Sequence, residues 1–322
     1  MRAVQVTTLE GPDAVRVAEV AEPEAQDRVL IGVATAGVSF PDLLLSRGLY
    51  QLKPPLPFVP GVEVAGTVRS APSGSGFGPG DQVMAFTMLG GFAEVAAADA
   101  ALTLPIPRTL NLEQAGGFLM NHHTAHFALA RRGRLRPGEW LAVHGAAGGL
   151  GLAAVQVGRG LGAHVAAVTS TPEKADAARQ AGADLAVLTT GDWASELRQL
   201  DGGRGPSVIF DPVGGDRFDA SVRCLAPEGR LLVVGFTEGR IPAVQVNRLL
   251  LRNIEVVGVA WGAFLAVEPG LFQSAQHELD RMLTEGTVVP QVGHVFPLDE
   301  AGAALRTLEE RRATGKVVLR VG

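Results

Sequence analysis

The chain of 322 residues has little cysteine, few aromatic residues and no excess of positive charge. Its single cysteine, Cys224, excludes an intramolecular disulfide and any zinc site built from several cysteines. We expect Cys224 to be a small buried side chain. With a net charge of -5, the chain lacks the basic surface that nucleic acid binding usually requires. We therefore expect no nucleic acid partner.

Long hydrophobic runs are also missing. No apolar stretch approaches the roughly 18 residues of a membrane-spanning helix, and the opening MRAVQV is typical of a strand rather than of a secretion signal. We expect a cytoplasmic protein with no membrane partner. Hydrophobic residues make up 47% of the chain and charged residues 19%, as in ordinary globular proteins. Single cores stop growing at about 250 to 300 residues, so the length predicts two domains.

A glycine-rich turn in residues 140–170 carries the strongest signal. An apolar run leads into the turn, a helix-spaced stretch follows, and a second apolar run closes the unit. Small residues stand in the A-x-G-x-x-G order because a pyrophosphate must approach bare backbone N–H groups at a helix N-terminus. We predict a dinucleotide site whose backbone contacts are Ala146, Ala147, Gly148, Gly149, Leu150 and Gly151.

The sequence before this turn is β-rich up to about residue 110. Apolar runs separated by Gly and Pro turns predict strands at residues 28–38, 62–68, 82–86 and 92–97. Residues 71–81 are predicted to form a hairpin-like loop. Helices are predicted to begin near Asn111, where Asn111 and Gln114 have the spacing of a capping box.

After the turn, strands and helices alternate. Helices are predicted at residues 171–180, 193–200 and 217–225, and strands at 185–188, 207–210, 230–234 and 254–259. This alternation implies βαβ units and a parallel sheet. Six strands complete a doubly wound α/β fold of the Rossmann type. A final helix pair and a strand at residues 315–320 follow, and we expect that strand to return to the first domain.

Six motifs carry a family resemblance across nearly the whole length. They are PPLPFVPGVEVAGTV at 54–68, GDQVMAF at 80–86, GGFAEV at 90–95, HGAAGGLG at 144–151, DPVGG at 211–215 and GKVVL at 315–319. In this order they resemble the quinone oxidoreductase (zeta-crystallin-like) branch of the medium-chain dehydrogenase/reductases. The resemblance implies a β-rich, GroES-like catalytic domain at residues 1–121, completed by 293–322, and a Rossmann domain at 122–292. It also implies an active site between these domains and a homodimer.

Some members of this superfamily use zinc, so the ligands must be sought in this chain. Val62 stands where the zinc enzymes carry a histidine, and their four-cysteine loop is missing. His122 and His126 share a helix face at the spacing of a zinc-binding pair, with His123 between them. No third ligand accompanies them. We therefore expect no metal, and expect the histidines to be polar residues at a helix start that line the cleft.

The strand after the glycine turn predicts which cofactor binds. NAD sites place an acidic residue there to bind the ribose 2′-hydroxyl, but this strand ends in Val168, Thr169 and Ser170. Thr171 and Pro172 open the next helix, with Lys174 in its first turn. We expect Thr169 in the site, Ser170 and Lys174 as contacts of a 2′-phosphate, and NADPH as the cofactor. A surface lysine beside an NAD site of modest selectivity is the alternative.

Other cofactor contacts depend on position and on the resemblance. Gly235 and Phe236 follow a predicted parallel strand, where doubly wound folds bind ligands, and the resemblance places them near the nicotinamide. Thr124 matches the family threonine beside the nicotinamide. Trp261 either lines the same cleft or packs at a subunit interface. The arginines near residues 131–136 are expected to form a solvated turn.

Residues 39–51 are the candidate acceptor segment. Typical members of this branch have Asn at the Ser39 position and Tyr at the Leu44 position, so their quinone contacts do not carry over directly. Tyr50, the only tyrosine, matches the catalytic tyrosine of enoyl-thioester reductases in the same superfamily. It is either a proton donor or substrate anchor, or an aromatic wall or ordered turn residue.

These observations predict an NADPH-dependent reductase that transfers hydride, without metal, to a quinone or other conjugated carbonyl. One alternative is a 2-enoyl-thioester reductase. The other is a structural protein that retains NADPH without turnover.

Overall fold

A computed structural model describes residues 1–322, which form two compact units. Unit 1 comprises Met1–Met120 and Pro290–Gly322, and unit 2 comprises Asn121–Val289. The first boundary between the two units, between Met120 and Asn121, lies within α3 (Leu119–His126). No helix has the length and apolar character needed to cross a membrane.

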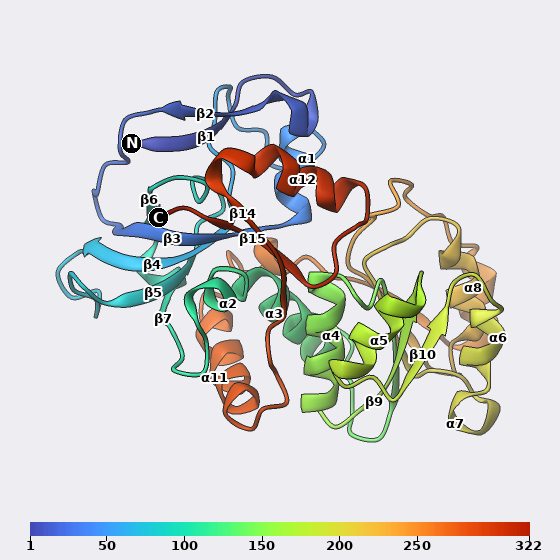
Figure 1. The fold of residues 1–322 in the computed structure, drawn as a ribbon. Helices are drawn as coiled ribbons and strands as arrows, with labels where there is room; N and C mark the ends of the chain where they lie inside the picture. Colours follow the sequence, from blue (N-terminus) through green and yellow to red (C-terminus); the bar gives the residue numbers. More distant parts are fainter. The chain divides into compact units, whose positions relative to one another are not determined.

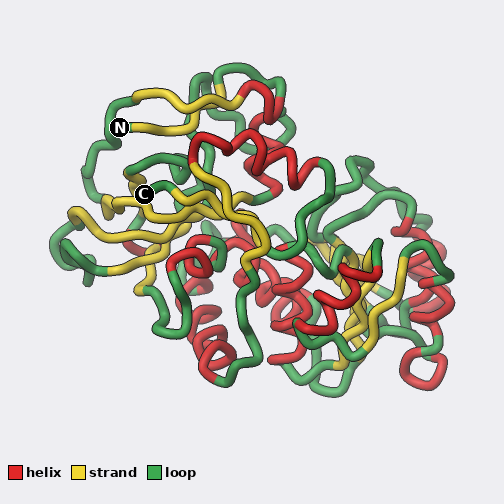
Figure 2. The backbone as a smooth tube through the Cα atoms, in the orientation of Figure 1, coloured by secondary structure: helices red, strands yellow, loops and turns green.

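Unit 1 is built around a seven-stranded sheet in the order β14-β15-β3-β4-β5-β7, with β6 also paired to β3 (Figures 1 and 2). The remaining two strands of unit 1, β1 and β2, form a separate two-stranded sheet. Their bounds are β1 (Arg2–Val6), β2 (Val15–Glu19), β3 (Val29–Val38), β4 (Glu63–Ser70), β5 (Gln82–Phe86), β6 (Val95–Ala98), β7 (Thr103–Pro105), β14 (Val292–Pro297) and β15 (Lys316–Arg320). The C-terminal strand β15 lies antiparallel to β3, which lies antiparallel to β4.

The helices of unit 1 are short. They are α1 (Phe40–Ser46), α2 (Leu112–Gly116) and α12 (Ala301–Glu309), with 3-10 turns η1 (Gly11–Ala14), η2 (Ala100–Leu102) and η4 (Leu298–Glu300). The predicted capping box of α2 is confirmed, because Gln114 N–H donates to Asn111 Oδ1 at 2.9 Å and Asn111 N–H donates to Gln114 Oε1 at 3.1 Å. The prediction that helices begin there is wrong. α1 precedes it, and its seven residues are too few to show helical periodicity.

Unit 2 contains a six-stranded sheet in the order β10-β9-β8-β11-β12-β13, with every pairing parallel. Its strands are β8 (Trp140–His144), β9 (His164–Thr169), β10 (Leu185–Leu188), β11 (Val208–Asp211), β12 (Arg230–Val233) and β13 (Glu255–Gly258). The chain winds from β8 to one edge and then from β11 to the other. This is the predicted doubly wound fold, and it makes β8 and β11 the point where strand order reverses.

Helices connect these strands. They are α4 (Gly149–Gly160), α5 (Pro172–Gln180), α6 (Trp193–Arg198), α7 (Leu200–Gly203), α8 (Arg217–Cys224), α9 (Val246–Arg252), α10 (Trp261–Phe264) and α11 (Leu271–Thr284), with a π-helix η3 (Phe127–Arg132) continuing α3. The expected helix pair before the last strand is instead three helices, α10 to α12, and the strand β14. α10 has four residues and β14 alternates partly buried with exposed residues, so neither has a strong pattern.

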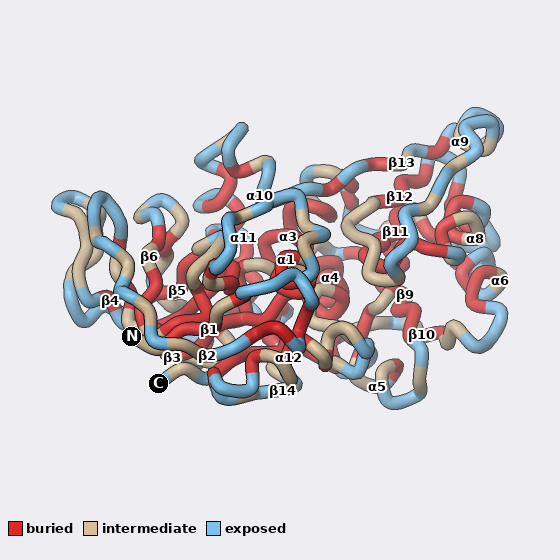
Figure 3. The backbone as a smooth tube through the Cα atoms, turned by 90° about the horizontal axis from the view of Figure 1, so that it is seen from above, coloured by how far each residue is buried: buried red, intermediate tan, exposed pale blue.

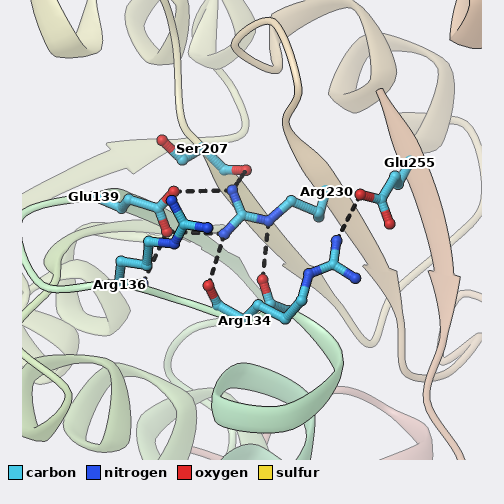
Figure 4. A network of polar contacts seen from close by, with 7 residues as sticks. Arg134, Arg136, Glu139, Ser207, Arg230 and Glu255 are labelled. Atoms are coloured by element: carbon cyan, nitrogen blue, oxygen red, sulfur yellow. Dashed lines mark hydrogen bonds and ion pairs between the residues drawn. The ribbon is translucent and has the colours of Figure 1, made fainter. Parts of the chain in front are cut away.

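Arg230 ties together the amino ends of the unit 2 strands (Figure 4). Its guanidinium donates to Glu139 at 2.8 and 2.9 Å and to backbone carbonyl oxygens of Gly133, Arg134 and Ser207. Burial raises the pKa of Glu139, but the Arg230 hydrogen bonds and the Arg136 N–H outweigh that effect, so the pKa is lowered. Arg230 is 8% exposed. It therefore joins β12 to the segments that enter β8 and β11.

Arg134, within the arginine run, lies at this same amino end. Arg134 pairs with Glu255 at 2.5 Å and Arg131 pairs with Glu268 at 2.8 Å. Both side chains keep about half of their surface in solvent, at 55% and 42%. Because the glycine turn follows the carboxyl end of β8, Arg134 lies at the opposite edge of the sheet from it.

Candidate functional site

The glycine turn joins β8 to α4 in unit 2. Gly145 has φ +60°, and its carbonyl accepts a hydrogen bond from Gly148 N–H at 3.1 Å. A Cβ on Gly151 would lie 2.1 Å from Gly145 O, so only glycine fits this position. α4 starts at Gly149 and is 12 residues long. Its first N–H groups lack intrahelical acceptors, and they provide the donors that a pyrophosphate requires.

The end of β9 contains the predicted 2′-phosphate contacts. Thr169 is buried, and its Oγ1 has no hydrogen-bond partner within the protein. Ser170 is exposed, and Thr171 caps α5 by accepting from Lys174 N–H at 3.3 Å. Lys174 is half-buried, and this burial lowers its pKa. The end of β9 thus carries hydroxyl side chains, followed by Lys174 in the first turn of α5, and no carboxylate stands at the strand end itself.

Two loops follow the carboxyl ends of β11 and β12. Asp211 Oδ1 accepts from the N–H groups of Val213 and Gly214 at 2.8 and 2.9 Å, and these bonds order its loop. The second loop is hydrogen-bonded to the first through Thr237 N–H and Pro212 O at 3.1 Å. A Cβ on Gly235 would lie 3.2 Å from Pro212 O, so glycine permits this close packing. Gly235 and Phe236, both half-buried, therefore lie at the same sheet edge as the glycine turn.

Thr124 and the three histidines belong to α3. Thr124 Oγ1 is buried without a protein partner, as a hydroxyl that contacts a bound cofactor would be before binding. His123 stacks on Phe272 with ring centroids 4.7 Å apart, and its Nε2 lies 2.9 Å from Gln276 Oε1. Burial, chiefly, lowers the pKa of His123 to about 3. His126 Nε2 lies 2.8 Å from Glu278 Oε2.

The predicted environment of these histidines needs correction. α3 begins at Leu119, so His122 lies in its first turn, and His123 and His126 lie beyond it. His123 is fully buried, and both His123 and His126 are hydrogen-bonded to α11. Sequence spacing showed that His122 and His126 share a face, but it contained no information on which helix packs against that face.

Trp261, at the start of α10, lies inside unit 2. It is 2% exposed and its ring centroid lies 5.5 Å from that of His123 and 6.3 Å from that of Phe272. These contacts pack α10 against α3 and α11. The expectation that Trp261 packs at a subunit interface is therefore wrong, because its indole is covered by its own unit. Its assignment as a cofactor contact stays a prediction.

Four buried polar residues of unit 1, Ser39, Asp42, Glu63 and Lys316, form what we call the buried polar cluster. Lys316 Nζ lies 2.7 Å from both Ser39 Oγ and Glu63 Oε1. Asp42 accepts from the N–H groups of Ser39 and Gly61 at 2.8 and 2.9 Å. Burial raises the pKa of Asp42 to about 7, against the lowering effects of these donors and of Lys316.

Sequence reasoning missed the role of Lys316, although a signal was present. The residues that follow it in β15, Val317 to Leu319, are all buried, so a lysine at the first position of this strand needs a buried partner. Glu63 likewise opens a strand of buried residues. The pairing of the two side chains depends on the order of β15, β3 and β4, which the sequence pattern does not specify.

Tyr50 lies in unit 1 and packs partly against its core. Burial raises the pKa of its phenol, and the charge of Asp42 raises it further. The phenol is therefore protonated at neutral pH and able to donate a proton. The other predicted site residues belong to unit 2, where the glycine turn, the end of β9 and the two loops share one sheet edge.

The chain matches two family models. Residues 25–108 match the alcohol dehydrogenase GroES-like domain, and residues 149–277 match the zinc-binding dehydrogenase model. Over 99% of its length it is 36% identical to quinone oxidoreductase-like protein 2 of Mus musculus, covering 91% of that protein.

Solved structures agree with this match. The quinone oxidoreductase of Thermus thermophilus, crystallised also with NADPH, is 35% identical with a TM-score of 0.85, and 100% of each chain is covered. A mycobacterial protein in complex with NADPH is 33% identical with a TM-score of 0.93, again with 100% of each chain covered. The fold is that of a medium-chain dehydrogenase/reductase. Within that class, the chain belongs to the quinone oxidoreductase family and is an oxidoreductase.

The name of the second family model implies zinc, but the residues present do not fit that ion. Val62 is an apolar side chain that is 2% exposed, and Glu63 is paired with Lys316. No group of three or more His, Cys, Asp or Glu side chains is arranged so that it could hold a metal ion.

Proposed function

We propose that this protein is an NADPH-dependent reductase that delivers hydride, without metal, to a quinone or other conjugated carbonyl. The observation that carries the proposal is the cofactor edge of unit 2. There a glycine turn that admits no Cβ at Gly151 leads into α4, and β9 ends in Thr169 and Ser170 beside Lys174 instead of in a carboxylate. Relatives crystallised with NADPH support the same choice of cofactor.

The residues fit the cofactor at three points. Backbone N–H groups at Ala147 and at Gly149 to Gly151 would bind the pyrophosphate, and Ser170 and Lys174 would bind the 2′-phosphate. The buried hydroxyl of Thr124 would contact the nicotinamide, with Gly235 and Phe236 beside it. NADPH, when bound, supplies the hydride.

In this proposal the chain itself provides hydrogen bonds and a proton. The phenol of Tyr50 has a raised pKa and stays protonated, so it serves as a proton donor to the carbon or oxygen that becomes basic once hydride has arrived. The same group would serve a 2-enoyl thioester, which makes an enoyl-thioester reductase the second candidate.

The test is NADPH oxidation by the purified protein with a small benzoquinone, a simple enone and crotonyl-CoA as separate acceptors. We expect turnover with the quinone or the enone. Faster turnover with crotonyl-CoA would replace the proposal with the enoyl-thioester activity. Tight NADPH binding without turnover of any acceptor would favour a non-catalytic protein and contradict the proposal.

We also propose a homodimer. β13 is an edge strand of the unit 2 sheet, and α9, which precedes it, buries none of its residues (Figure 3). Val246, Leu250 and Leu251 are 72%, 75% and 76% exposed. Light scattering should give twice the chain mass of 33.5 kDa. A mass of one chain at micromolar concentration would exclude the dimer.

A further inference from the structure

The segment that leaves β12 lies against a neighbouring loop of unit 2. We call residues 235–240 the strap, which follows the end of β12. Thr237 N–H donates to Pro212 O at 3.1 Å. Glu238 N–H donates to Val213 O at 3.0 Å, so the strap runs along the loop that follows β11. β11 pairs with β8 at the point where the strand order reverses and where doubly wound folds bind their ligands.

The side chain of Glu238 fastens the strap next to α8. A Cβ on Gly215 would lie 1.5 Å from Glu238 Oε2, so the carboxyl group fills the space directly over Gly215. Gly215 has φ +65° and lies in the turn that leads into α8. The positive end of the helix dipole favours a carboxylate at such a turn. Any side chain at position 215 would displace this carboxyl group, so the contact requires glycine there.

A second contact connects the strap to the same turn. The guanidinium of Arg240 pairs with the carboxylate of Asp216, and Gly215 N–H donates to Arg240 O at 3.2 Å. The two charged side chains keep 64% and 84% of their surface in solvent, so their ion pair contributes little. Glu238 Oε2 is covered, which makes Glu238 the stronger of the two side-chain contacts.

The strap is not held by a hydrophobic core. None of residues 234–245 is buried, although β12 immediately before them is mostly buried. Segments with few buried apolar contacts open at a lower free-energy cost than the elements that flank them. Gly239 has φ +98°, and a Cβ there would meet nothing within 4 Å, so the backbone has room to turn near this end of the strap. Hydrogen bonds and the Glu238 contact therefore keep the strap in place.

We propose that the strap is a gate at the cofactor edge of unit 2 and that Glu238 is its latch. The inference rests on the proposed function, which assigns Gly235 and Phe236 of the strap to the nicotinamide. The strap must then move aside whenever NADPH enters or leaves. A weaker latch should raise the rates of binding and of release by a similar factor and leave the Kd almost unchanged. Loss of a side chain that contacts NADPH directly would instead change mainly the release rate, and the Kd with it.

The first experiment measures both rates by stopped-flow fluorescence of NADPH for wild type, Glu238→Ala, Glu238→Gln and Glu228→Ala. Glu228 is the matched control, because it is an exposed glutamate in the turn before β12, at the opposite edge of the sheet. We expect Glu238→Ala to raise both rates about 10-fold, with the Kd within about twofold of wild type. Glu238→Gln keeps the shape but not the charge, and should raise both rates about threefold. Glu228→Ala should match wild type. Unchanged rates in Glu238→Ala, or a rise in the release rate alone, would overturn the inference.

The second experiment detects opening of the strap without the cofactor. Trypsin cleaves after arginine, and cleavage that requires local opening follows the population of the open form. We expect cleavage after Arg240 to be about 10-fold faster in Glu238→Ala than in wild type or Glu228→Ala, and saturating NADPH to slow it. Cleavage after Arg204, an exposed arginine of the same unit, should be equal in all three proteins. Equal rates of cleavage after Arg240 would show that Glu238 is not a latch.

These measurements keep the gate distinct from the proposed function, because neither of them requires turnover. If the rates change as expected in a protein that reduces no acceptor, the reductase proposal fails and the gate stands. If the protein reduces a quinone or an enone and Glu238→Ala binds and releases NADPH at wild-type rates, the gate fails and the reductase proposal stands. A wild-type protein that binds no NADPH would contradict both.

Discussion

Tyr50 is the only tyrosine in the chain. Its raised pKa, caused by burial and by Asp42, keeps the phenol protonated below pH 10, so a reaction that uses this proton should lose rate only above that pH. We expect Tyr50→Phe to lower kcat/KM for a conjugated carbonyl by about 10²-fold. The ratio of the wild-type kcat/KM to the variant kcat/KM should stay constant between pH 6 and 9. Steady-state kinetics across that range check this. A fully active Tyr50→Phe protein would show that the phenol donates no proton and that Tyr50 only lines the site.

Protonation of Asp42 affects stability near neutral pH. Its folded pKa of about 7 lies above its ordinary value of 3.8. The folded protein therefore holds a proton that the unfolded chain has released, so this group makes the free energy of unfolding fall as pH rises from about 4 to 7.

At the scale of single residues, the sequence was informative where chemistry is local. The capping box of Asn111 and Gln114 was predicted from their spacing, and both of its hydrogen bonds are present. Lys316 and the environment of His123 were missed because their partners lie on segments distant in sequence, at Ser39 and Gln276. No spacing rule in a single sequence specifies such contacts.

At the scale of elements, the turn before α4 is the feature most sensitive to substitution. A Cβ on Gly151 would collide with Gly145 O at 2.1 Å, so Gly151→Ala must displace the turn. We expect the Kd for NADPH to rise at least about 10-fold, because the backbone donors lose their alignment. Gly270→Ala is the control, because a Cβ there meets nothing within 4 Å and φ is -70°. Fluorescence titration with NADPH measures the Kd of both variants. An unchanged Kd in Gly151→Ala would show that the pyrophosphate does not bind at this turn.

The amino edge of the same sheet is predicted to serve stability alone. Arg230→Met leaves Glu139 without its ion pair and three carbonyl oxygens without their donor. We expect the free energy of unfolding to fall by about 3 to 5 kcal/mol. Arg134→Met, which removes an exposed pair with Glu255, should cost at most about 1 kcal/mol. Urea unfolding compares the two, and equal midpoints would show that the Arg230 network is not stabilising.

Elements with strong patterns were predicted well, and short ones were not. The alternation after the glycine turn led to the six-stranded sheet because the four central strands, β9, β8, β11 and β12, are mostly buried apolar runs. α1, α10 and β14 were missed or misassigned because they have only seven, four and six residues, and β14 has no fully buried residue. In such segments tertiary contacts, such as the bonds from Asp42 to Ser39 and Gly61, decide the conformation.

At the scale of the whole molecule, the fold class follows from the sequence but the acceptor does not. The predicted α/β fold with a doubly wound sheet and a β-rich GroES-like unit is confirmed. The acceptor segment departs from the family pattern at Ser39 and Leu44, so the motifs that identify the family do not identify the substrate. The assignment of a cofactor to the carboxyl edge of the unit 2 sheet stays a proposal, supported by relatives that were crystallised with NADPH.

The central claim is that this edge selects NADPH. Binding of NADPH and NADH should be measured by fluorescence titration for wild type, Lys174→Ala and Arg179→Ala, the last a control on the same helix, where Arg179 pairs with Asp176. We expect wild type to bind NADPH at least about 10-fold tighter than NADH, because a charged hydrogen bond contributes about 1.5 to 3 kcal/mol. Lys174→Ala should lose that preference and leave NADH binding unchanged, while Arg179→Ala keeps it. Equal binding of both nucleotides to wild type, or equal weakening of both by Lys174→Ala, would contradict the account.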